Sequence, residues 1–294
     1  MSTRCWSLND HGIDLPTKMN NPSTTWSYGV SLKKFSKRLL QLSAAALAVS
    51  AAVSHSPAAL GEETATLRVQ FKIKGDAPKG SKITPTVDQA FCGQFGIPDE
   101  TLVVNPDNKG IANVILYADT GRLGTKLPKV DAEPKTVVLA NENCRFQPRV
   151  VFVTVGDTLK ITNPDKVSHN ANMQFLVNTP ENPNIPPGGS HETTPASAEP
   201  APIPVSCNIH PWMKAQVVVI DNPYGAASDA DGVIEIKGLP AGKVTMRAIH
   251  DAGRMSTVYL NGKKTSWRGA RWKLELKPGV NDLGVVEVDA DVFK

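Results

Sequence analysis

The stretch PVSCNIHPWMKAQVVVI, residues 204–220, places three potential metal ligands directly before an apolar run. Cys207, His210 and Met213 recur at every third residue, and we expect a β-strand to begin at Lys214. A thiolate, an imidazole and a thioether are side chains that bind soft or borderline metals, copper above all. The spacing therefore predicts a metal-binding loop. The alternative is a plain turn that contains a buried methionine and an ordinary cysteine.

A second histidine is needed to complete a copper site of this kind. Type-1 copper is bound by two imidazoles and a thiolate, with a weak axial thioether. The loop supplies one imidazole and is too short to surround a metal, so the other must come from a different strand. His169 is the candidate, because it lies 38 residues before Cys207 and follows GDTLKIT (156–162), a predicted hairpin turn and strand.

Composition favours an all-β chain. Of the 294 residues, 40% are hydrophobic and 20% are charged, which is typical of a globular protein. The chain has 22 glycines and 23 prolines but few segments with helical periodicity. Segments such as ATLRVQFKIKG (65–75) and VIEIKGL (233–239) alternate in polarity and predict half-buried strands. The sequence contains no dinucleotide fingerprint, phosphate loop or nucleic-acid-binding motif.

The first 61 residues predict an export leader. Lysines and arginines at 33–38 precede a weakly apolar run at 39–53, and small residues follow. Secretory signals have this order of basic, apolar and small-residue regions. We expect cleavage near Gly61 and export to the periplasm or the surface of a bacterial cell, with an uncleaved membrane anchor as the alternative.

Without the leader, the basic excess of the chain disappears. The whole chain has 32 Lys and Arg, 28 Asp and Glu, and a formal net charge of +4. Six of the bases and two of the acids lie in residues 1–61, which leaves 26 of each. The charge therefore gives no reason to expect nucleic acid as a partner.

The cysteines predict one disulfide and one free thiol. Cys5 lies in the leader, and Cys92, Cys144 and Cys207 remain. An odd number in an exported chain indicates a free thiol. Cys92 and Cys144 are the expected pair in an oxidising compartment, which leaves Cys207 free among its histidine and methionine neighbours. The alternative pairs Cys207 with Cys144 and leaves Cys92 free.

We expect three regions after the leader. Residues 62–135 are predicted to be an N-terminal β extension packed on the copper-bearing sandwich. Residues 136–221 are predicted to be the copper-binding domain, and residues 222–294 a small C-terminal β module. Residues 177–206 contain eight prolines, which predicts a long surface loop.

The strand before Cys207 is expected to be unusual. Pro202 and Pro204 lie in it, and proline has no backbone N–H to donate to a neighbouring strand. We therefore expect this strand to lie at an edge of its sheet, or to be irregular.

The segments VTVGDTLKITNPDKVSHNANM (153–173) and CNIHPWMKAQVVVI (207–220) together resemble the cupredoxin family of blue copper proteins. The C-x2-H-x2-M spacing is similar to that of the amicyanin-type members, which carry electrons in bacterial methylamine oxidation. The resemblance covers residues 136–221 and implies a Greek-key β-sandwich that binds one type-1 copper. It implies these copper ligands: equatorial His169, Cys207 and His210, and axial Met213.

The same resemblance implies roles for neighbouring residues. Asn170 would tie the two ligand loops together by hydrogen bonds. Pro211 and Trp212 would lie at an apolar rim, beside a partly exposed edge of His210 where electrons enter and leave. With no ligand position open for a substrate, the chain is expected to be an electron carrier with redox proteins as partners, and not an enzyme. The alternative is a cupredoxin-like structural or binding protein that holds no copper.

The C-terminal region has a resemblance of its own. The segment SDADGVIEIKGLPAGKVTMRAIH (228–250) resembles small transthyretin-like or carboxypeptidase-regulatory-like β modules. Ile234 stands where an aromatic residue is common in these modules, and Val244 stands where tyrosine is common. The resemblance implies a structural or binding role, with protein or carbohydrate as the partner.

Overall fold

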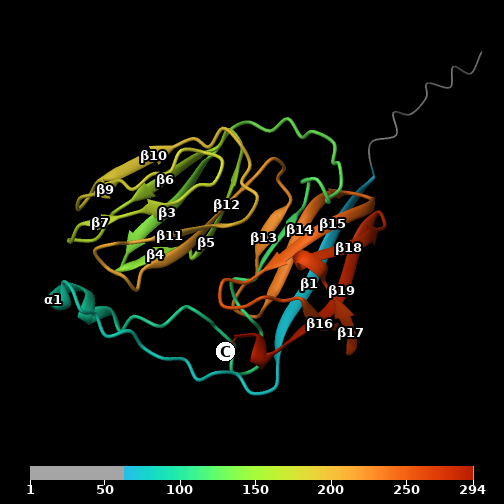
Figure 1. Cartoon of the computed structure of the whole chain (residues 1–294), viewed down its shortest axis with the longest axis horizontal. Helices are drawn as coiled ribbons and strands as arrows, with labels where there is room; N and C mark the ends of the chain where they lie inside the picture. Colours follow the sequence, from blue (N-terminus) through green and yellow to red (C-terminus); the bar gives the residue numbers. More distant parts are fainter. Residues whose placement is uncertain (1–62, 294) are drawn as a thin grey trace, which may run out of the picture. The chain divides into compact units, whose positions relative to one another are not determined.

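Two β-sandwiches make up the part of the chain that the computed structural model describes, residues 63–293. The predicted leader, residues 1–61, lies outside the described residues. The prediction of an all-β chain is confirmed, since the described helices are short (Figure 1). These helices are α1 (Gln89–Cys92) and the 3-10 turns η1 (Gly93–Phe95), η2 (Arg268–Ala270) and η3 (Ala290–Phe293). Within residues 63–293, no helix is both long and apolar enough to cross a membrane.

The first sandwich carries the predicted ligands, and we call it the ligand sandwich. One sheet has the strand order β10 (Ser190–Thr193), β6 (Thr158–Thr162), β3 (Thr136–Glu142), β4 (Arg145–Gln147). The other has the order β5 (Val150–Thr154), β12 (Lys214–Ile220), β11 (Ile203–Ser206), β8 (Asn172–Met173). A two-stranded sheet pairs β7 (His169–Asn170) with β9 (Asn184–Ile185). The core of the ligand sandwich includes Leu139, Phe146, Ile161 and Val217.

The second sandwich lies in the same compact unit as the first, within the described residues 63–293, and we call it the terminal sandwich. One sheet has the order β14 (Val233–Pro240), β1 (Thr64–Lys74), β19 (Gly279–Asp289), β16 (Thr257–Leu260), β17 (Lys263–Ser266). The other has the order β13 (Gly225–Ala227), β2 (Ile115–Ala118), β15 (Gly242–Ile249), β18 (Arg271–Leu276). Phe71 and Trp267 meet edge to face in its core, with ring centroids 6.3 Å apart.

Strand β12 is buried on both faces, which explains its unbroken run of apolar residues. Ala215, Val217 and Val219 point into the core of the ligand sandwich. Val218 and Ile220 point the other way, into a small cluster that also contains Ile115 and Tyr117 of β2. This cluster joins the two sandwiches.

The N-terminal strands do not add to the ligand sandwich as expected for residues 62–135. Strand β1 pairs antiparallel with β14 and parallel with β19, and β2 pairs with β13 and β15. Figure 1 shows the blue β1 among the orange and red strands of the C-terminal third. The alternation of β1 marks it as a half-buried strand, but it carries no information about which sheet it joins. Residues 222–294 are therefore not a self-contained module, and their resemblance to one is not supported.

The segment between β1 and β2 does contact the ligand sandwich. Cys92, at the end of α1, forms a disulfide with Cys144, with an S–S distance of 2.03 Å. Ile97 packs beside the disulfide, and Trp212 packs against the same cluster. The predicted pairing of Cys92 with Cys144 is thus confirmed, and Cys207 is free.

The proline-rich stretch is more ordered than predicted. Residues 177–206 contain β9, β10 and β11 instead of one long loop. The strand before Cys207 keeps an open side at its first two residues: Ile203 and Pro204 pair with β12, whereas β8 meets only Val205 and Ser206. Pro204 therefore costs no ladder bond toward β8, and the expectation of an edge position holds for this half of the strand.

Candidate metal centre

Three of the predicted ligands converge in the interior of the ligand sandwich. Nδ1 of His169 lies 2.9 Å from Nδ1 of His210, and Sγ of Cys207 lies 3.8 Å from the same His210 nitrogen. One ligand atom from each of the three residues falls within 4.8 Å of the others. All three side chains are buried. The chain thus brings the imidazole of His169, on β7, to the thiol and the imidazole that share the loop between β11 and β12.

Short backbone elements hold these side chains in place. His169 begins β7, which pairs with β9, and Cys207 directly follows β11. In the loop that follows, the N–H of Met213 donates to the carbonyl of His210 at 2.9 Å. The N–H of Cys207 donates to the carbonyl of Met213 at 3.3 Å. These bonds close the C-x2-H-x2-M segment into a compact turn between β11 and β12.

Both imidazoles bind a carboxylate through their outer nitrogen. Nε2 of His169 lies 3.0 Å from Oδ2 of Asp165, and Nε2 of His210 lies 3.0 Å from Oδ2 of Asp88. Because an ionised carboxylate only accepts hydrogen bonds, each Nε2 carries the proton. The Nδ1 lone pairs of both rings then face the cluster, which is how carboxylates orient metal-binding histidines.

This arrangement fits a cation between the two rings. Two Nδ1 lone pairs 2.9 Å apart repel each other unless a proton or a metal ion lies at them. Burial by itself lowers the pKa of His169, but the Asp165 carboxylate and Cys207 outweigh it and raise this pKa above its usual value. The site is thus built to hold positive charge. Two imidazoles and a thiolate form a donor set that suits copper.

Cys207 is poised as a thiolate. Burial raises its pKa, but the neighbouring side chains of His169 and His210, together with hydrogen bonds from the backbone amides of Asn170 and His210, outweigh this and lower the pKa to about 6. Hydrogen bonds to the charged form favour that form. Since the thiolate is the species that binds metals, the thiol of Cys207 is ready to act as a ligand at neutral pH.

Asn170 joins the two ligand loops. Its side-chain oxygen accepts from the N–H of Asn208 at 2.7 Å and from the N–H of Ile209 at 3.3 Å. The Cys207 thiol lies 3.4 Å from the same oxygen. The structure therefore places the side chain of Asn170 between the strand that carries His169 and the loop that carries Cys207.

The remaining predicted site residues lie around the same loop. Met213 is buried in the core of the ligand sandwich, next to the turn that carries His210. Trp212 packs its ring 5.1 Å from that of His210 and donates its indole N–H to the carbonyl of Cys144 at 3.1 Å. Pro211 is exposed.

The prediction of a partly exposed His210 is wrong. Its side chain has 0% exposure, because the segment around α1 covers it. Asp88, the residue that precedes α1, directs its carboxylate to Nε2 of His210 instead of to the helix N-terminus. The Cys92–Cys144 disulfide fastens the other end of this helix. We call residues 81–99 the cap.

The two carboxylates were not among the predicted site residues. Asp165 had a signal in the sequence, since it lies in a turn four residues before His169 and carboxylates commonly orient metal-binding histidines. Asp88 had no comparable signal, because 122 residues separate it from His210. Only the folded chain brings it there.

Two other candidates for metal binding, a cluster around Cys144 and the single residue His250, have structural roles instead. Cys144, Asp165 and His169 also lie close together, but the sulfur of Cys144 is in the disulfide and is not a thiolate. His250 is buried, and its two ring nitrogens contact the carbonyl of Ala112 and the N–H of Ala252. Burial lowers the pKa of His250, as expected for a neutral structural histidine.

Solved structures similar to part of the chain include copper proteins of the cupredoxin type. An oxidised amicyanin mutant is 23% identical over 29% of this chain and 81% of its own, with a TM-score of 0.26. The purple cupredoxin of Nitrosopumilus maritimus is 22% identical over 29% of this chain and 98% of its own, with a TM-score of 0.25. The copper-containing nitrite reductase of Thermus scotoductus SA-01 is 22% identical over 33% of this chain, with a TM-score of 0.27. The match spans only 25% of that reductase. No protein-family model matches the sequence, and no curated protein matches it.

Proposed function

We propose that this chain is an exported copper protein that carries single electrons through one mononuclear type-1 centre, and that it is not an enzyme. The observation that carries the proposal is the buried convergence of two imidazole nitrogens, 2.9 Å apart, with the low-pKa thiol of Cys207. His169, His210 and Cys207 would hold the metal. Met213, from the same loop, would supply a further, weaker thioether ligand.

Copper supplies a one-electron couple when bound. The chain's own residues would fix the ligand positions and exclude water. Asp165 and Asp88 orient the imidazoles, and Asn170 fixes the loop that bears Cys207. The core of the ligand sandwich surrounds the three ligand atoms. A ligand set that is held by hydrogen bonds and shielded from water suits electron transfer, because little has to rearrange when the charge changes.

The partner we propose is another redox protein, at the periplasm or the cell surface. An amicyanin-like place in methylamine utilisation is the finer proposal, and it rests on the C-x2-H-x2-M spacing. The alternative is a copper-free structural protein, or one that binds carbohydrate or protein through its terminal sandwich.

Copper titration of the full metal-free chain, followed by visible absorption, tests the proposal. We expect an intense thiolate-to-copper band that saturates at about one copper per chain. Cys207→Ser should abolish the band. His191→Gln is the matched control, because His191 binds Glu181 at 2.6 Å on β10, away from the cluster, and this variant should titrate like the parent.

Two results would decide against the proposal. A colourless chain that retains no copper would favour the structural alternative. A chain that binds copper but cannot be reduced and reoxidised reversibly by one electron would not be a carrier.

A further inference from the structure

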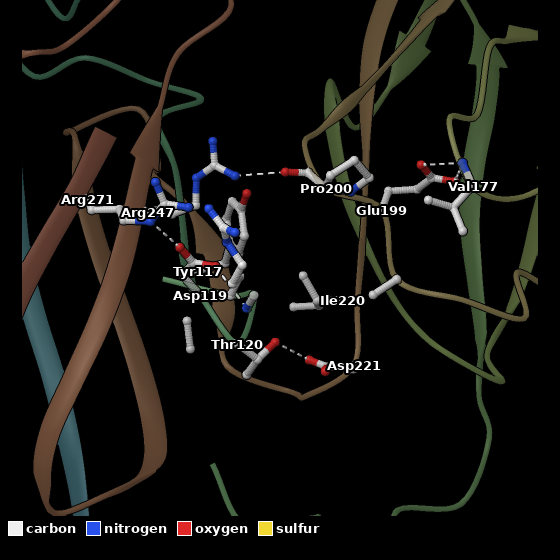
Figure 2. Close-up of a pocket in the computed structure, with 14 residues that line it drawn as sticks. Tyr117, Asp119, Thr120, Val177, Glu199, Pro200, Ile220, Asp221, Arg247 and Arg271 are labelled. Atoms are coloured by element: carbon white, nitrogen blue, oxygen red, sulfur yellow. Dashed lines mark hydrogen bonds and ion pairs between the residues drawn. The ribbon is translucent and has the colours of Figure 1, made fainter. Parts of the chain in front are cut away.

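A cavity of about 370 Å³ lies where the two sandwiches meet, apart from the metal centre. Figure 2 shows Tyr117, Arg247 and Arg271 of the terminal sandwich along one wall. Val177, Glu199 and Pro200 of the ligand sandwich form the facing wall. Ile220 and Asp221, at the end of β12, lie between the two walls (Figure 2).

Two polar groups in this cavity have no partner. The hydroxyl of Tyr117 and Nε of Arg247 are both buried, and neither has a hydrogen-bond partner among the described residues. Tyr117 as a whole is 5% exposed. Buried polar groups in proteins are nearly always hydrogen-bonded, so two unpaired ones in the same cavity point to a ligand.

The unpaired groups can both donate. Burial raises the pKa of Tyr117 against the opposing effect of the neighbouring Arg247, and its protonated phenol has a hydrogen to give. Nε of Arg247 is a donor at any pH. Nη1 of the same arginine donates to the carbonyl of Pro200 at 2.7 Å, which holds the guanidinium in the cavity. A ligand for these groups must therefore bring acceptors.

The acidic groups of the cavity already have donors. Glu199 accepts from the backbone N–H groups of residues 176–178 and from the amide of Asn178. Asp119 accepts from Nε of Arg271 at 2.6 Å, and Asp221 accepts from the hydroxyl of Thr120 at 2.7 Å. Arg247 has no carboxylate partner among the described residues. The buried side-chain groups of the cavity that lack a partner are thus the two donors.

We propose that this cavity binds a small molecule with a carboxylate or phosphate group, held by Arg247 and Tyr117. Guanidinium groups bind both anions through paired N–H donors. The side chains of Val177, Pro200 and Ile220 offer an apolar surface to the rest of the ligand. The site needs no copper, and it is separate from the electron-carrier function.

Isothermal titration calorimetry of the full chain with two probes, benzoate and inorganic phosphate, tests this site. We expect at least one probe to bind with one-to-one stoichiometry. Tyr117→Phe removes only the unpaired hydroxyl, and Arg247→Gln removes the unpaired donor. Each should weaken binding about 10-fold or more, as for loss of a hydrogen bond to a charged group. Arg254→Gln, which removes an exposed arginine outside the cavity, should leave binding unchanged.

The outcomes separate the possibilities. Binding of benzoate alone identifies a carboxylate ligand, and binding of phosphate alone identifies a phosphate ligand. The site is refuted if neither probe saturates below about 10 mM, or if Tyr117→Phe binds as tightly as the parent. Cys207→Ser must keep the affinity, since its loss would place the anion at the metal centre. Thermal unfolding checks that each variant folds. If Arg247→Gln fails to fold, the binding of Tyr117→Phe alone decides the test.

Discussion

Nε2 of His210 donates to the carboxylate of Asp88 at 3.0 Å, although the two residues lie 122 positions apart. His210 is fully buried, while the Asp88 side chain is 39% exposed. The carboxylate therefore stands between the imidazole and the solvent. It fixes the tautomer of the ring and closes the side of the metal centre that the sequence predicted to be open.

Removing this carboxylate should weaken metal binding. Asp88→Ala frees Nε2 of His210, so the ring is no longer held with Nδ1 toward the cluster. We expect copper affinity to fall about 10- to 100-fold, as is usual when the outer partner of a metal-binding histidine is lost. Competition with a chelator of known affinity measures the change. Asp76→Ala, at an exposed position, is the control. Equal affinities in the two variants would show that Asp88 does not position His210.

The cap should depend on its disulfide. Cys92 and Cys144 are 52 residues apart, and a crosslink over such a loop contributes about 4 kcal/mol in the chain-entropy description. We expect the double variant Cys92→Ser, Cys144→Ser to lose stability of this order in urea unfolding.

The same double variant should exchange electrons faster, because a loosened cap exposes His210. Stopped-flow oxidation of the reduced copper protein by a small metal complex measures the rate. A slower or unchanged rate in a variant that still binds copper would rule out the cap as a barrier.

Asn170 should stabilise the ligand loop. Asn170→Ala removes the oxygen that accepts from the N–H of Asn208 at 2.7 Å and from the N–H of Ile209 at 3.3 Å. Asn208 is exposed, so water replaces part of the lost bond, and we expect a loss of about 1 kcal/mol in thermal or urea unfolding, with a shifted copper band. Asn184→Ala is the matched control, since Asn184 pairs opposite Asn170 in β9 and its side chain is exposed. Similar losses in both variants would contradict a special role for Asn170.

Glu199 should make stability fall in acid. Burial raises its pKa, but hydrogen bonds from Asn178, Val177 and Leu176 outweigh this and lower the pKa below the usual value. A depressed pKa stabilises the fold above the usual glutamate range, and that stability is lost as pH falls through the folded-state pKa.

The variant Glu199→Gln tests this dependence. At pH 7 it should be less stable than the parent by about 1–3 kcal/mol, and the difference should shrink below about pH 4. Glu192→Gln, at a half-exposed surface pair with Lys160, should show almost no difference at either pH. Urea unfolding at several pH values gives the comparison, and a difference that does not change with pH would contradict the assignment.

Local spacing predicted much of the side-chain cluster at the candidate metal centre. Cys207, His210 and Met213 share one short loop, so their proximity follows from the chain alone. His169 could be added because a turn and a strand precede it. Counting the cysteines predicted one free thiol, and the histidine and methionine beside Cys207 favoured Cys92 and Cys144 as the disulfide pair. These inferences used local sequence patterns and required little knowledge of which distant segments come into contact.

Contacts over long sequence separations could not be predicted. The alternation in β1 gave its secondary structure, but any sheet with an apolar face would satisfy it, so its pairing with β14 and β19 was open. Asp88 was missed for the same reason. Prolines in residues 177–206 hid three short strands, because a residue without an N–H is tolerated wherever one side of a strand is free.

The parallel pairing of β1 with β19 constrains the order in which the chain acquires its structure. Ala65 lies opposite Gly279, so this sheet closes only after almost the entire described chain has been synthesised. The ligand sandwich, in contrast, takes all its strands from residues 136–220. Shorter loops close at lower entropic cost, so we expect the metal centre to form first and its cap to settle last. Pulsed hydrogen exchange during refolding would show earlier protection in β12 than in β1. On the proposed function, copper would then meet a pocket that is assembled but still uncovered.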